Sequence, residues 1–171
     1  MMTSSIFSRV FEKIIVGLNV TATFWVFMMV MFVVIDVGGR LFFKTPLTGT
    51  PEIIRLSNPM IVFLQITYVL WIGRHIRTDI LLDRMSRKGA AFINILNALM
   101  GIFIFALNFY SGWSLTVTAF SEWEYEGEGA LRVPVGPVRL VILIGTVLMI
   151  IQFSRIIFTN VSSLVKTYSQ R

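Results

Sequence analysis

The chain of 171 residues contains no cysteine and only one histidine, His75. The absence of cysteine excludes disulfides, thiolate metal sites and cysteine nucleophiles. A single histidine cannot supply the paired axial ligands that haem usually takes in a membrane bundle, nor a multi-histidine metal site. The sequence therefore predicts a protein with no metal, no cofactor and no catalytic residue of its own.

Charged residues are also scarce, at 14% of the chain against roughly a quarter in a soluble domain. Hydrophobic residues make up 56% and are gathered into four long runs, each near the roughly 20 residues that cross a bilayer. We therefore expect an all-α membrane protein with four transmembrane helices in a single domain, residues 1–171. The net charge of +6 fits basic loops beside a membrane better than it fits a nucleic-acid partner.

The apolar runs place the four spans at approximately 14–43, 51–73, 90–120 and 134–158. The third run is longer than a perpendicular crossing requires, so we expect tilt or a protruding end. The basic segment 74–88 has apolar residues at rough helical spacing, which is typical of a short helix in the membrane interface. A solvated loop is the alternative for that segment.

The distribution of lysine and arginine predicts the orientation of the chain. Ten of these residues lie on the side that holds both termini, and five lie on the other side. Because cytoplasmic loops carry the excess of positive charge, both termini are expected in the cytoplasm.

Four charged residues lie near the predicted outer ends of the first two helices. Asp36 and Arg40 are one turn apart on the first helix, and Glu52 and Arg55 are three residues apart on the second. A tight turn between antiparallel spans puts all four at a similar depth. Because the set is neutral, we interpret it as a structural clamp or interface between helices. Solvated interfacial charges and a transport site are the alternatives.

The deeper part of the predicted bilayer region contains polar but uncharged residues, which usually form hydrogen bonds between helices. An ion-coupled carrier is expected to keep a carboxylate or a broken helix near the midplane. The sequence therefore predicts no substrate-binding residue. An acidic stretch before the fourth span is either a docking surface or a solvated turn. Its glutamates are Glu122, Glu124, Glu126 and Glu128.

Residues 36–79 resemble the small membrane subunit of tripartite ATP-independent periplasmic (TRAP) transporters, the DctQ type. The resemblance reappears after the acidic stretch and covers most of the chain. The residues that carry it include Asp36, Arg40, Pro46, Gly49, Glu52, Arg55, Pro59, Gly73, His75, Arg77, Asp79 and Pro134.

The resemblance implies a multi-pass subunit in the bacterial inner membrane, surrounded by lipid and bound to a large multi-span permease subunit. In such a system a periplasmic solute-binding protein delivers an organic acid, and the large subunit carries out uptake by symport driven by an ion gradient. The small subunit would brace the large one and help to dock the binding protein. The four charges would then be fold and interface residues, while the turn at Lys44–Thr50 and the loop Glu122–Glu128 would face the binding protein.

An autonomous small carrier acting as a homo-oligomer is the alternative function. Such a carrier needs an essential charge in the membrane, so replacing Glu52 or Asp36 with the amide should abolish its activity but not its assembly. A membrane enzyme is the least supported class, because the chain has one histidine, no cysteine and no acidic cluster on the predicted cytoplasmic side.

Overall fold

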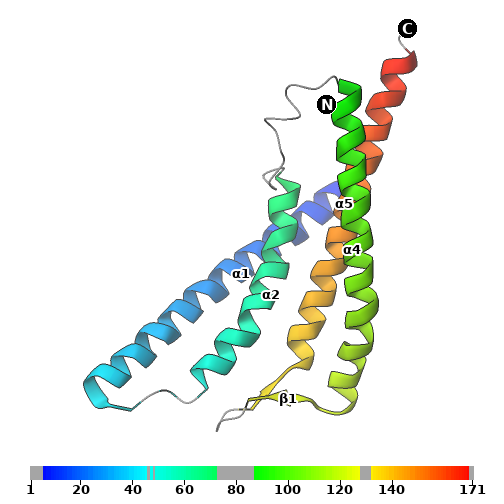
Figure 1. Cartoon of the computed structure of the whole chain (residues 1–171). Helices are drawn as coiled ribbons and strands as arrows, with labels where there is room; N and C mark the ends of the chain where they lie inside the picture. The colour runs from blue at the N-terminus through cyan, green and yellow to red at the C-terminus, as the bar shows by residue number, and fades with distance from the viewer. Residues whose placement is uncertain (1–5, 46, 48, 73–86, 128–131, 170–171) are drawn as a thin grey trace.

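The computed structural model describes residues 6–45, 47, 49–72, 87–127 and 132–169, in which helices dominate (Figure 1). The helices are α1 (Ile6–Gly38), continued by the π-helical segment η1 (Gly39–Phe43), then α2 (Thr50–Trp71), α4 (Arg87–Ser121) and α5 (Gly136–Ser169). Two short strands, β1 (Tyr125–Glu126) and β2 (Val133–Pro134), pair antiparallel between α4 and α5.

Four of these helices are long and apolar enough to cross a membrane, which confirms the predicted number of spans. Two helices extend furthest beyond the predicted span ends: α1 begins at Ile6 and α5 continues to Ser169. The two-stranded sheet was not expected from the sequence, since each strand has only two residues. Of the predicted interfacial segment 74–88, all but the last two residues lie outside the described residues, and those two begin α4.

The helices alternate in direction. α1 and α4 run toward the end of the molecule that carries the β1–β2 hairpin, which we call the hairpin end, and α2 and α5 run away from it (Figure 1). α2 packs against both α1 and α5, and α5 packs against both α2 and α4. α1 begins close to α5 but crosses the others diagonally, so that its last turns stand well apart from α4 and α5 (Figure 1).

The buried core that joins α1 to the rest lies toward the end opposite the hairpin. Phe11 and Ile15 of α1 are buried against Leu148 of α5, and Tyr68 and Trp71 of α2 pack on the same cluster. The guanidinium of Arg155 lies 5.2 Å from the centre of the Phe11 ring, in a cation–π arrangement. The first turns of α1 are therefore the part of this helix that the core holds.

The contacts of α5 with α2 and α4 depend on small residues, as is common between membrane helices. A Cβ added at Gly145 would lie 2.7 Å from the carbonyl oxygen of Phe63, so α2 and α5 touch backbone to backbone there. The ring of Phe153 lies against Gly101, and the Thr146 hydroxyl donates a 3.0 Å hydrogen bond to the side-chain oxygen of Asn108. These contacts make α2, α5 and α4 one closely packed unit.

Candidate functional site: the charged hairpin end

Asp36 closes the connection between α1 and α2. Only 5% of this residue is exposed, and its carboxylate accepts two bonds. The backbone N–H of Leu47 donates to Oδ1 at 2.8 Å, and Nη2 of Arg40 forms an ion pair with Oδ2 at 2.8 Å. A buried carboxylate is stable only with such donors, so Asp36 fixes the path of the chain as it leaves α1.

The same connection depends on two residues in the left-handed backbone region. Lys44, at φ 53°, ends the π-helical segment η1 and donates its N–H to the carbonyl of Gly39. Gly49, at φ 91°, lies immediately before α2, where a side chain would be strained. This conformation gives a physical reason for glycine at position 49. It also makes Gly49 the N-terminal cap of α2, with Thr50 as the first helical residue and Pro51 next.

Arg139 joins α5 to the acidic loop and to α4. Its two terminal nitrogens bind both carboxylate oxygens of Glu124, at 2.6 and 3.0 Å. Nη1 also donates to the backbone carbonyl of Leu115 at 2.8 Å. The guanidinium is only 25% exposed, and its bidentate geometry makes this the best-formed charged contact among the described residues.

A second ion pair attaches the hairpin to α2. Arg55 pairs with Glu126, although the arginine side chain is 77% exposed. Through these two ion pairs, the loop between α4 and α5 is tied to α5 and to α2. Two of the four predicted docking glutamates, Glu124 and Glu126, therefore have partners within the chain, whereas Glu122 is exposed.

Glu52 differs from the other described acids of the hairpin end. Its Oε2 atom is buried and has no hydrogen-bond partner among the described residues. The residue lines a cavity of about 330 Å³ together with Pro51, Arg55, Glu126 and Gly127. This cavity lies between the first turn of α2 and strand β1 with the residue after it.

The structure divides the four predicted clamp charges rather than linking them through one network. Asp36 pairs with Arg40, but Arg55 pairs with Glu126, and within the described part of the chain no ion pair joins α1 to α2. Lys44 is exposed at the end of η1. Pro59 lies inside α2, and Pro134 pairs with Tyr125 in the hairpin. The remaining predicted residues, Pro46, Gly73, His75, Arg77, Asp79 and Glu128, lie outside the described residues.

Arg139 is the functional candidate that sequence reasoning missed. In the sequence analysis Arg139 served only as one of the basic residues that were counted to predict the orientation of the chain. The available signal was an arginine at the start of a span that follows an acidic loop. This pattern does not specify a partner, because the loop contains several glutamates at alternating positions.

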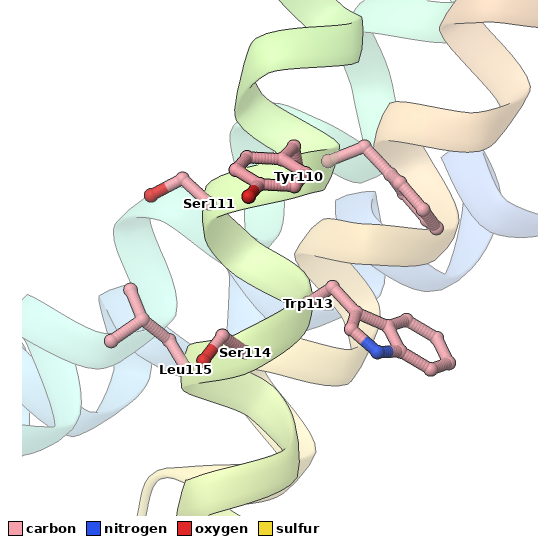
Figure 2. Close-up of a pocket in the computed structure, with 6 residues that line it drawn as sticks. Tyr110, Ser111, Trp113, Ser114 and Leu115 are labelled. Atoms are coloured by element: carbon pink, nitrogen blue, oxygen red, sulfur yellow. The ribbon is translucent and has the colours of Figure 1, made fainter.

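A cavity of about 720 Å³ is an open depression whose described lining consists of six residues of α4, and Figure 2 shows their side chains projecting from successive turns of this helix. Tyr110 in this depression is 83% exposed. Within the described residues no three His, Cys, Asp or Glu side chains lie together as metal ligands would.

Four membrane-crossing helices, with their described acid–base ion pairs collected at one end, define a small multi-pass helical membrane protein. The family model described as "Tripartite ATP-independent periplasmic transporters, DctQ component" matches residues 29–162, so the chain belongs to this family of TRAP transporter small permease subunits. The family comprises transporter subunits, not enzymes. No curated protein and no solved structure matches the chain. The resemblance found in the sequence is thereby confirmed.

Proposed function

We propose that the chain is the auxiliary subunit of a tripartite uptake transporter for an organic acid. It braces a large multi-span permease subunit in the bacterial inner membrane and helps to dock a periplasmic binding protein. The large subunit holds the substrate and couples uptake to an ion gradient. With both termini in the cytoplasm, the hairpin end faces the periplasm. Membership of the DctQ family supports the division of labour.

The observation that carries this proposal is the lack of charge in the middle of every described helix. An ion-coupled carrier of an organic acid needs groups in the membrane that bind the ion and the carboxylate. The following segments contain no Asp, Glu, Lys, Arg or His: 14–35, 56–71, 89–121 and 140–154. A chain of this kind is suited to support a carrier that another subunit provides.

Purification and reconstitution test the proposal. The tagged chain is expected to co-purify with a much larger hydrophobic subunit, and liposomes are expected to accumulate substrate only when both subunits and the binding protein are present. Uptake by the purified chain alone would contradict the proposal.

The buried Oε2 atom of Glu52, which has no hydrogen-bond partner among the described residues, is the observation that favours the alternative, an autonomous homo-oligomeric carrier. In such a carrier Glu52→Gln abolishes transport by the chain alone and leaves its assembly intact. If the chain is instead an auxiliary subunit, the large subunit still transports substrate when it is bound to the Glu52→Gln variant and to the binding protein.

The orientation has its own test, because the chain has no cysteine to give background labelling. Ser121→Cys lies at the hairpin end and Arg9→Cys near the start of α1. A membrane-impermeant maleimide added to intact cells is expected to label the first variant and not the second. The reverse pattern would place the hairpin end in the cytoplasm.

A further inference from the structure

The Glu52 cavity has an excess of negative charge. Among the described residues, its ionisable walls are two carboxylates, Glu52 and Glu126, and one guanidinium, Arg55. The guanidinium already pairs with Glu126. The cavity therefore retains one acid that forms no ion pair with a described base.

Glu52 is half-buried, and the burial of its Oε2 atom makes this charge costly in the free chain. A carboxylate oxygen that loses water and gains no donor destabilises the folded state. The other described acids of the hairpin end with buried or half-buried side chains each have an ion pair. A partner protein that supplies the missing hydrogen-bond donor best explains why a carboxylate occupies this position.

The walls of the cavity indicate from which side that partner comes. Two of the five lining residues, Glu126 and Gly127, belong to the connection between α4 and α5, outside the four membrane-crossing helices. The other three lie in the first two turns of α2, at the same end of the molecule. If this end faces the periplasm, as in the proposed function, a soluble protein in that compartment can reach the cavity without entering the bilayer.

We propose that the Glu52 cavity receives a basic side chain, lysine or arginine, of the periplasmic binding protein. The ammonium or guanidinium group donates to the Glu52 carboxylate, and Arg55 holds Glu126 beside it as the second wall. The binding protein thus neutralises a charge that the free subunit leaves unpaired. The inference rests on the proposed function, which by itself names no contact residue for docking.

The experiment measures binding of the soluble protein to the two-subunit membrane complex in lipid nanodiscs by surface plasmon resonance. Glu52→Gln keeps the shape of the side chain and removes its charge. It is expected to weaken binding about tenfold, mainly through faster dissociation, while Glu52→Arg weakens it further. The thermal stability of the free complex is expected to stay equal or to rise with Glu52→Gln, because an unpaired buried charge has been removed.

Two control variants change the net charge by the same amount. Glu12→Gln lies in α1 far from the hairpin end and is expected to leave docking unchanged. Glu122→Gln removes an exposed acid of the hairpin end outside the cavity and is expected to weaken binding much less than Glu52→Gln. Equal weakening by both hairpin-end variants would mean that only the overall field attracts the partner, and would overturn the proposal.

Normal binding by Glu52→Gln would also overturn it, as would a loss of binding accompanied by a loss of thermal stability. Failure of the proposed function gives a different result. In that case the large subunit does not co-purify with the wild-type chain, and the complex needed for the docking measurement does not form.

Discussion

The two flanking helices, α1 and α4, bury equally little of their surface but are attached to the molecule in different ways. In the most apolar 18-residue stretch of each, only 11% is buried within the molecule. The corresponding share is 28% in α2 and in α5. Yet α4 follows α5 closely, with Gly101 beneath Phe153 and Gly112 beside Leu143. In α1, Gly17 and Gly38 have no neighbouring side chain or helix within 4 Å of an added Cβ.

This difference indicates which surface is available to a membrane partner. Most of α1 after its first turns is apolar and uncovered, with large side chains such as Phe24 (60% exposed) and Val20 (61%). Within the chain, α1 is fixed near its start by the Phe11 cluster and at its end by Asp36. Between these two points Ala22 is fully buried within the chain, and most of the other side chains of the helix are exposed. α2, α5 and α4 form the more closely packed part of the molecule.

The largest expected effect comes from replacing a glycine with alanine, first in the closely packed unit of α2, α5 and α4 and then in α1. Gly145→Ala places a methyl group 2.7 Å from the Phe63 carbonyl, so α2 and α5 must separate, at a cost of about 1–3 kcal/mol in the free energy of unfolding. Gly17→Ala in α1 meets nothing and favours the helix by up to about 1 kcal/mol. Denaturation in mixed micelles measures both, and equal effects would remove the contrast between the regions.

The next effect concerns the attachment of α1 at the hairpin end. Asp36→Ala removes both the acceptor for the Leu47 N–H and the partner of Arg40, and we expect a loss of about 1–2 kcal/mol. Asp36→Asn retains an acceptor oxygen and loses only the ion pair with an arginine that is 53% exposed, so its cost is expected to be about half as large. Identical unfolding curves for the two variants would show that the ion pair, not the turn, holds α1.

A smaller effect is expected when the hairpin is released from α5. Arg139→Gln breaks the bidentate contact with Glu124 and the bond to the Leu115 carbonyl, which should cost about 1 kcal/mol. Arg55→Gln, at a more exposed pair, should cost less than that. Hydrogen exchange of residues 122–127 is expected to accelerate clearly in the first variant and slightly in the second. The opposite order would make α2 the main support of the hairpin.

The smallest effect is expected within the α4–α5 contact itself. The hydrogen bond between Thr146 and Asn108 lies between two membrane helices, where such bonds contribute about 0.6 kcal/mol on average. A double-mutant cycle with Asn108→Leu and Thr146→Val is therefore expected to give a coupling energy of that order. A value near zero would leave the glycine contacts as the main cause of the close packing of α4 on α5.

The pairing of the charges at the hairpin end is where sequence reasoning was least complete. Spacing alone suggested that Asp36 and Arg40 can pair, because residues four apart share a helix face, and the structure contains this pair. Spacing gave no indication that Arg55 binds Glu126 or that Arg139 binds Glu124, which lie 71 and 15 residues apart in the sequence. Such contacts depend on how the loop folds back over the helices, and no local pattern encodes that path.

The sequence by itself determined that four helices can cross a membrane, because long apolar runs need a bilayer around them and the hydrogen bonds of a helix within it. It also determined the family, through residues spread along most of the chain. Only the tertiary structure decided which charges are paired and that the buried Oε2 atom of Glu52 has no donor among the described residues. The physical reason is that hydropathy is a property of each residue and its sequence neighbours. An ion pair instead needs two side chains, often distant in the sequence, that the fold brings within about 3 Å of each other.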